Sequence, residues 1–206
     1  MIGAVMVMGA LAEGVAWWAI SRRGLNVWST MAPVLVGLGV LALLTGRPAL
    51  SQDRPVGLAA GVGAASGLAL YLATRLFVAV VAPRWRAFRT QSLQMYGRRG
   101  TRSLGAVLLL SVGLMVPGEE LFWRGLVLPE LEGSLTGALG PVVAWTAFVA
   151  ANVPSLNLAI VAGAGVGGAV WVALASWSGG VLAGLLCHAG WTALMLAFPP
   201  LDEVTT

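Results

Sequence analysis

The stretch PGEELFWRG, residues 117–125, decides how the rest of this chain is interpreted. It places two carboxylates, Glu119 and Glu120, and one guanidinium, Arg124, inside a run of residues that is apolar on both sides. An ionised side chain at the centre of a membrane helix costs roughly 2.5 to 3.5 kcal/mol on insertion scales. Charges gathered so closely therefore need partners or a chemical role.

The composition assigns nearly the whole chain to a lipid bilayer. Of its 206 residues, 58% are hydrophobic and 10% are charged, whereas soluble domains carry roughly 25% charged residues. Apolar runs of about 20 residues, the length of one membrane helix, recur from end to end without the alternation of transmembrane strands. We therefore expect an all-α, polytopic transmembrane bundle of about seven helices (roughly six to eight), in a single membrane domain over residues 1–206.

The polar residues divide this domain into three parts. Residues 1–82 are expected to be accessory transmembrane helices, residues 83–102 a basic interfacial connection, and residues 103–198 the core that carries the charged stretch. The connection has six arginines and no acidic residue, and the aromatic residues between them are typical of a helix in the headgroup layer. We expect the lipid bilayer to be the partner of this charge, and no nucleic acid. A loop is expected over Pro129–Thr136.

Helical geometry separates the charges of the opening stretch. Glu120 and Arg124 are spaced i, i+4 and face each other, so they can form an ion pair. Glu119 points about 100° away from Glu120 and has no local cation. An unpaired carboxylate of this kind is a candidate general base. Glu13, in the first helix, is interpreted as structural because no second polar residue accompanies it at helical spacing.

A second group of polar side chains lies in the later helices. His188, the only histidine, has Thr192 one turn further along the same face. Asn152 ends an earlier helix, one turn after Phe148. A lone histidine in an apolar helix is more often a hydrogen-bonded core residue than a catalyst, but together with an unpaired intramembrane carboxylate it indicates a functional site. Glu119 and His188 are the candidate catalytic residues.

Two other chemistries could use the same side chains. A catalytic zinc ion needs three protein ligands, which here would be the uncommon set Glu119, Glu120 and His188. We therefore expect no cofactor, although the sequence does not exclude a divalent metal. A small transporter could also use a glutamate and a histidine, but it would usually show repeated halves or interrupted helices in matching positions, and the sequence shows neither.

The motifs resemble a known family. Glu119, Glu120 and Arg124 match the E-E-x-x-x-R motif of the CAAX prenyl protease and bacteriocin-processing family of intramembrane endopeptidases, which are also labelled abortive-infection proteins. The order of the later motifs, F-x-x-x-H and then H-x-x-x-N, agrees over roughly residues 103–198. The resemblance implies that Glu119 activates water, that Glu120 and Arg124 support it, and that His188 helps to hold the oxyanion. Residues 103–198 would then be a protease-like core.

Two positions depart from the family's pattern. Asn152 stands where the family has a histidine thought to help position the water, and Thr192 stands where it has an asparagine that donates to the oxyanion. A threonine hydroxyl can still donate, whereas an asparagine amide cannot take a proton from water. Phe148, Asn152 and Thr192 are thus expected to be supporting residues. Two functions are favoured: an intramembrane endopeptidase that hydrolyses peptide bonds with Glu119-activated water, and a catalytically impaired pseudoprotease that binds membrane peptides. A small transporter is the less favoured alternative.

These features predict the partners and the cellular location of the protein. The partner is a peptide or protein substrate, membrane-bound or lipidated, in addition to the bilayer itself. All 12 basic residues are arginines, and this bias, with the compact length, favours an integral membrane protein of a prokaryotic plasma membrane.

Overall fold

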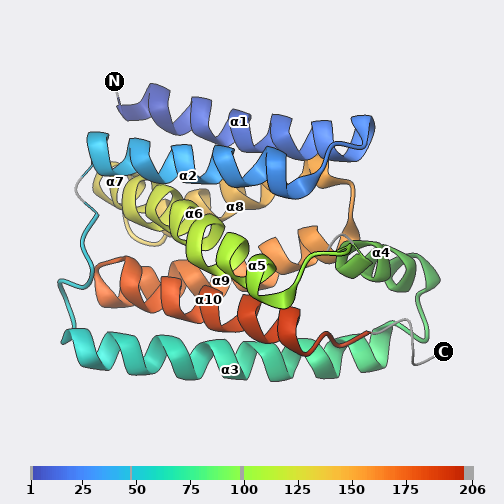
Figure 1. Ribbon diagram of the computed structural model, residues 1–206. Coiled ribbons are helices and arrows are strands. Elements are labelled where there is room, and N and C mark those ends of the chain that lie inside the picture. Colours follow the sequence, from blue (N-terminus) through green and yellow to red (C-terminus); the bar gives the residue numbers. More distant parts are fainter. Residues whose placement is uncertain (1, 47, 98–99, 202–206) are drawn as a thin grey trace.

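The computed structural model describes residues 2–46, 48–97 and 100–201, and within these ranges every regular element is a helix. The elements are α1 (Ile2–Arg23), α2 (Val27–Thr45), α3 (Val56–Val81), α4 (Arg86–Gly97), α5 (Leu104–Leu108), η1 (Leu109–Met115), α6 (Val116–Phe122), η2 (Trp123–Val127), α7 (Leu128–Ser134), α8 (Leu139–Asn152), η3 (Val153–Ser155), α9 (Leu158–Ser178) and α10 (Val181–Ala197). Figure 1 shows α1 and α2 along one side of the bundle, α3 with α10 along the other, and α4 at one end. The helix α6 packs against both α2 and α10.

The lengths of the helices confirm the prediction of a polytopic all-α bundle. Within the described residues, five helices are long and apolar enough to cross a membrane: Ile2–Arg23, Val27–Thr45, Val56–Val81, Leu104–Ser134 and Leu158–Ser178. Two shorter apolar helices, Leu139–Ser155 and Val181–Ala197, lie among them. The chain is an integral membrane protein.

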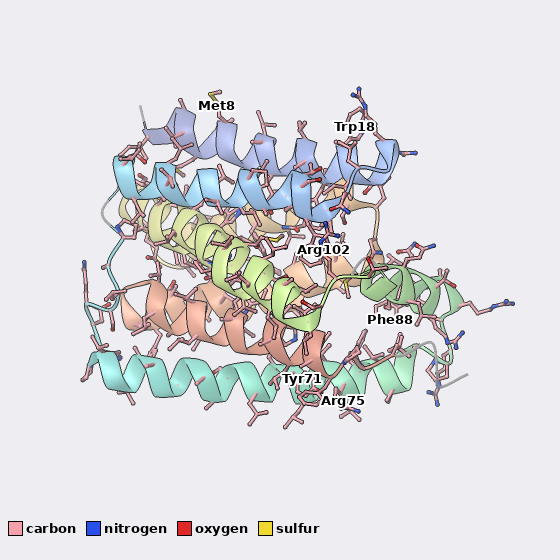
Figure 2. All side chains as sticks on the ribbon, viewed as in Figure 1. Met8, Trp18, Tyr71, Arg75, Phe88 and Arg102 are labelled. Atoms are coloured by element: carbon pink, nitrogen blue, oxygen red, sulfur yellow. The ribbon has the colours of Figure 1, made fainter. Side chains whose placement is uncertain are left out.

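The outer surface of the bundle is apolar. Met8 and Trp18 project outward from α1 in Figure 2, and Leu44, Leu76 and Leu109 are also exposed on other helices. In water such a surface would be an extended hydrophobic patch. In a bilayer these side chains face acyl chains, which agrees with the membrane assignment.

The helix from Leu104 to Ser134 is continuous and contains two π-helical segments, η1 and η2. Each π segment is followed by a proline near the start of the next α segment, Pro117 in α6 and Pro129 in α7. The wider hydrogen-bond register of a π segment accommodates a proline ring and its missing N–H without ending the helix. The predicted loop over Pro129–Thr136 is therefore wrong, because α7 continues the helix to Ser134.

Glycines let two pairs of helices approach closely, as the abundance of small residues in α3 indicates. A Cβ atom on Gly63 of α3 would lie 2.5 Å from the Ala183 carbonyl oxygen of α10, and one on Gly67 would lie 2.7 Å from that of Cys187. Where α2 crosses α6, a Cβ on Gly118 would lie 2.2 Å from the Leu35 carbonyl oxygen. These contacts fix the backbone beside Glu119 and His188.

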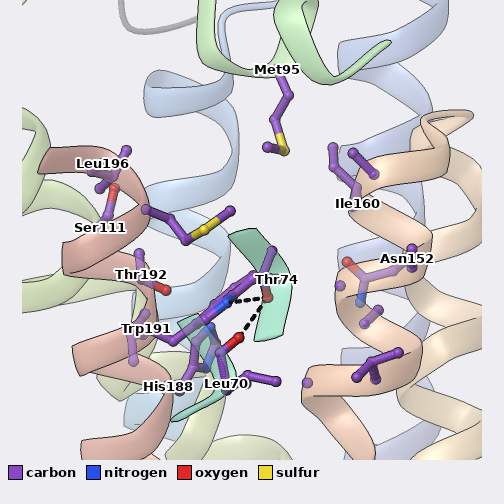
Figure 3. A pocket seen from close by; sticks show the side chains of 18 of the residues that line it. Leu70, Thr74, Met95, Ser111, Asn152, Ile160, His188, Trp191, Thr192 and Leu196 are labelled. Atoms are coloured by element: carbon purple, nitrogen blue, oxygen red, sulfur yellow. Dashed lines mark hydrogen bonds between the residues drawn. The ribbon is translucent and has the colours of Figure 1, made fainter. Parts of the chain in front are cut away.

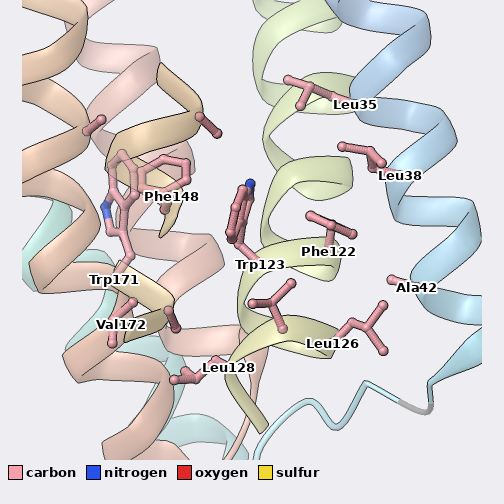
Figure 4. Packing of buried hydrophobic residues seen from close by; sticks show 14 of the residues in the cluster. Leu35, Leu38, Ala42, Phe122, Trp123, Leu126, Leu128, Phe148, Trp171 and Val172 are labelled. Atoms are coloured by element: carbon pink, nitrogen blue, oxygen red, sulfur yellow. The ribbon is translucent and has the colours of Figure 1, made fainter. Parts of the chain in front are cut away.

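Aromatic and aliphatic side chains fill the space between the motif helix and its neighbours. Figure 4 shows Phe122 and Leu126 toward α2, and Trp123 toward Phe148 and Trp171. The Trp123 and Phe148 rings meet edge to face with their centroids 5.5 Å apart. Glu120 and Arg124, the two buried charged residues of the motif, are therefore embedded in a packed hydrophobic core.

The helix α4 is anchored at the start of α9. Its Gln91 side chain accepts a hydrogen bond from the Leu158 backbone N–H at 2.6 Å, and the Asn157 side chain donates to the Gln91 carbonyl oxygen at 2.9 Å. Phe88 packs against Val78 at the end of α3. Two of the six arginines of the predicted interfacial connection, Arg98 and Arg99, lie outside the described residues, and the interfacial location of this segment remains a prediction.

The close contact between α3 and α10 can be tested by adding one methyl group. We expect Gly63→Ala to lower the free energy of unfolding by about 1 to 3 kcal/mol, since the new methyl overpacks against the α10 backbone. The matched control is Gly61→Ala on the same helix, where a Cβ would meet no atom within 4 Å. Thermal unfolding of both variants in detergent measures the difference, and equal stability would contradict the close packing.

Candidate functional site

The Glu120 carboxylate lies at the centre of the buried polar groups. Its Oε1 atom is 2.9 Å from His188 Nδ1 and 3.3 Å from Arg124 Nη1, and both the Glu120 and Arg124 side chains are fully buried. The ion pair predicted from the i, i+4 spacing is therefore present. The contact to His188 joins α6 to α10 across 68 positions of sequence.

Aromatic rings complete the surroundings of Arg124. Its guanidinium carbon lies 4.3 Å from the Phe148 ring centroid and 5.3 Å from that of Trp171. Its Nη2 atom is 3.5 Å from the Gly168 carbonyl oxygen. Cation–π contacts are stronger where water is excluded, so Phe148 acts as packing for the arginine. This gives a physical reason for the aromatic residue in the second motif.

His188 is held in one orientation. Its ring stacks on that of Trp171, with centroids 3.6 Å apart and an interplanar angle of 13°. Because an ionised carboxylate can only accept, Nδ1 carries the proton in the contact with Glu120. The second ring nitrogen, Nε2, makes no hydrogen bond to any described residue and is the atom available to a bound molecule.

Glu119 occupies a different environment from its neighbour Glu120. It is half-buried, and among the described residues no hydrogen bond or ion pair involves its carboxylate. It lines a cavity instead. The adjacent glutamates thus differ as helical geometry predicted, one being paired in the core and the other open to a cavity.

The candidate residues meet at this cavity, which has a volume of about 490 Å³. Its lining includes Glu119, Phe148, Asn152, His188 and Thr192. Figure 3 shows Asn152 on one side of the open space and His188 with Thr192 on the other. These five predicted site residues line the cavity. The other two lie directly behind its wall, with Glu120 against His188 and Arg124 against Phe148.

Most of the remaining cavity wall is apolar. It includes side chains from α1, α3, α4 and α9, among them Trp17, Leu70, Phe88, Met95 and Ile160. The polar side chains of the site thus lie within a mostly hydrophobic cavity. A mostly apolar pocket with a few convergent polar groups is typical of a ligand or substrate site.

Asn152 has a partner that the sequence analysis did not assign to the site. Its Nδ2 atom donates to Glu13 Oε1 at 3.1 Å and to the Phe148 carbonyl oxygen at 3.0 Å, and Trp123 Nε1 donates to Glu13 Oε2 at 2.8 Å. Glu13 is 1% exposed. No polar residue stands at helical spacing from Glu13 in the sequence, so this contact was not predicted. The high cost of a carboxylate in a membrane helix was the one signal that Glu13 needs a buried partner.

The residues considered as zinc ligands do not form a three-ligand group. In residues 2–46, 48–97 and 100–201, no set of three or more histidine, cysteine, aspartate or glutamate side chains is arranged to hold a metal ion. Glu120 is already bound to His188 and Arg124.

Comparison with known protein families gives a match over part of the chain. The family model described as Type II CAAX prenyl endopeptidase Rce1-like matches residues 101–194, which contain all three motifs and extend from α5 to near the end of α10. No curated protein and no solved structure matches the chain. The match covers less than half of the chain, agrees with the family resemblance of the motifs, and leaves α1 to α4 outside the matched segment.

The buried contact at Glu120 gives a stability prediction. Glu120→Gln removes the negative charge and leaves the Arg124 guanidinium buried without a counter-ion, which typically costs about 3 to 5 kcal/mol. Glu130→Gln is the matched control because Glu130 is exposed. Chemical denaturation in detergent should show the loss for Glu120→Gln alone. Two variants of the same stability would mean that the ion pair contributes nothing to the fold.

Proposed function

We propose that the protein is an intramembrane endopeptidase that hydrolyses a peptide bond with water activated by Glu119, because residues 101–194 match the Rce1-like type II CAAX prenyl endopeptidase model. The observation that carries the proposal is the meeting of Glu119, Asn152, His188 and Thr192 at one cavity inside the bundle. Hydrolysis requires a base, a bound water and donors for the oxyanion within reach of one carbonyl group.

Glu119 is the proposed general base. Its carboxylate faces the cavity and makes no hydrogen bond or ion pair with a described residue that would hold it elsewhere. It takes one proton from water while the oxygen of that water attacks the carbonyl carbon of the substrate. The same proton later passes to the nitrogen of the leaving peptide. This sequence needs no covalent intermediate with the protein.

His188 and Thr192 are the proposed donors to the oxyanion. With Nδ1–H bound to Glu120, Nε2 takes up a proton from solvent before the reaction; the resulting imidazolium donates a hydrogen bond to the negative oxygen and keeps this proton when the intermediate collapses. The Glu120 carboxylate stabilises the imidazolium, as the buried aspartate does in serine-protease triads. The Thr192 hydroxyl donates from one turn further along α10. Loss of one such donor typically lowers the rate by about 10² to 10³.

The second candidate function is a pseudoprotease that binds membrane peptides without cleaving them. It is favoured by Asn152, whose amide stands where the family has a histidine and cannot accept a proton. The Nδ2 atom of Asn152 is engaged by Glu13 and Phe148, so only its oxygen is left to orient water. The two functions share the cavity and differ only in turnover.

The apolar wall of the cavity supports a hydrophobic substrate. We propose a peptide or protein that is embedded in the membrane or carries a lipid, since such a chain could enter from the bilayer without crossing water. The proposal places the protein in a prokaryotic plasma membrane, on the strength of its all-arginine basic residues.

The role of Glu119 is tested by Glu119→Gln, which keeps the size of the side chain and removes its basicity. With a purified protein in lipid nanodiscs and an internally quenched prenylated peptide ending in a CAAX sequence, we expect no cleavage by this variant. Glu130→Gln should cleave at the wild-type rate. Cleavage by Glu119→Gln at a rate close to that of the wild type would exclude the glutamate mechanism.

The role of Asn152 is tested by Asn152→His, which restores a group able to share a proton. We expect the rate of peptide cleavage to rise by about 10²-fold, within the usual range for a general base. In the pseudoprotease case, activity would appear where the wild type has none. Asn152→Leu, of similar size but without an acceptor, is the control. A histidine variant no faster than the leucine variant would show that position 152 has no part in activating water.

A further inference from the structure

We propose that Glu13 of α1 is a positioning residue of the cavity site, which holds the Asn152 amide so that its oxygen faces the bound water. The inference rests on the proposed endopeptidase function and deepens it. It concerns a residue outside the segment that matches the family model, residues 101–194. It also gives α1 a role in the site, although the sequence predicts that residues 1–82 are accessory helices.

The position of Glu13 is fixed by the packing of α1. The buried face of this helix consists of Gly9, Glu13, Ala16 and Ile20. Gly9 lies so close to the Phe122 ring that a Cβ atom would be 2.3 Å from it. Since Glu13 follows Gly9 by one helical turn, the close contact at Gly9 brings the Glu13 carboxylate against the motif helix.

The hydrogen bonds of Glu13 determine the orientation of Asn152. The Nδ2 atom has two hydrogens, and it has two acceptors, Glu13 Oε1 at 3.1 Å and the Phe148 carbonyl oxygen at 3.0 Å. The Phe148 carbonyl oxygen and an ionised carboxylate can only accept, so the opposite orientation of the amide would place its oxygen against acceptors. Oδ1 makes no hydrogen bond to a described residue, and Figure 3 shows it directed into the open space.

The other oxygen of Glu13 ties this arrangement to the motif helix. Trp123 Nε1 donates to Glu13 Oε2 at 2.8 Å, and Trp123 adjoins Arg124 in sequence. The Glu13 carboxylate therefore holds donors from two helices, α8 and the helix that carries Glu119. Moving it would alter both the amide orientation and the spacing between Asn152 and Glu119.

The arrangement suits a water molecule shared between Glu119 and Asn152. The water would donate one hydrogen to the Glu119 carboxylate and the other to Asn152 Oδ1, which leaves a lone pair free to attack a carbonyl carbon. An amide in this position orients water without taking its proton. Glu13 would thus preserve the orienting part of the role that the family assigns to a histidine.

A purely structural role for Glu13 predicts a different result. In that case its loss would destabilise the bundle and would leave Asn152 and the rate constant of the folded protein unaffected. Glu13→Gln separates the two roles because the amide keeps the shape of the side chain. One of its two terminal atoms becomes a donor, so it can no longer accept from both Asn152 and Trp123.

The first experiment measures kcat and KM for the quenched prenylated CAAX peptide with the full chain in nanodiscs. We expect Glu13→Gln to lower kcat by about 10-fold or more and to change KM by less than about 2-fold, while Glu130→Gln leaves both unchanged. In an Asn152→Ala background, Glu13→Gln should lower kcat by a much smaller factor, since Glu13 acts mainly through Asn152. Equal fold-losses in kcat in both backgrounds would overturn the proposal.

The second experiment does not depend on activity, so it separates failure of this inference from failure of the endopeptidase function. The chain has three asparagines, and protein labelled with ¹⁵N-asparagine gives one pair of side-chain amide signals for each. The Asn152 pair is identified by its loss in Asn152→Ala. We expect Glu13→Gln to shift this pair and to speed its hydrogen exchange with water. Unchanged Asn152 signals would overturn the proposal even if the peptide is cleaved.

Discussion

A single carboxylate oxygen, Glu120 Oε1, organises this bundle. It contacts Arg124 on its own helix and His188 on α10, in a region closed to water. A buried carboxylate without such partners would be strongly destabilising, so the helices must be arranged to supply them. That requirement orients the His188 ring, and the stack on Trp171 keeps it there. The histidine therefore reaches the cavity with one nitrogen already bound.

The motif helix places its two adjacent glutamates in different environments. Glu120 faces the core, and Glu119, about 100° around the helix, faces the cavity. The π segments before Pro117 and Pro129 keep this helix continuous despite both prolines. The contact of Gly118 with the Leu35 carbonyl oxygen fixes the backbone beside Glu119. One element thus provides both the buried anchor and the proposed base.

Local spacing in the sequence was sufficient to predict part of the site. The division between Glu119 and Glu120, and the pair with Arg124, follow from the period of one helix. The hydrogen bond from His188 to Glu120 joins residues 68 positions apart, and no local rule could select Glu120 over Glu119 as its partner. Glu13 was missed for the same reason, since its partner Asn152 is 139 positions away.

The single histidine of the chain allows the central contact to be measured directly. In protein labelled with ¹⁵N-histidine, NMR reports which ring nitrogen carries a proton, without interference from any other histidine. If Glu120 holds His188 at the cavity as described, Nδ1 is protonated in the wild-type protein, and Nε2 is the nitrogen whose signal responds when a peptide binds. A wild-type spectrum with Nε2 protonated and Nδ1 bare would contradict the account.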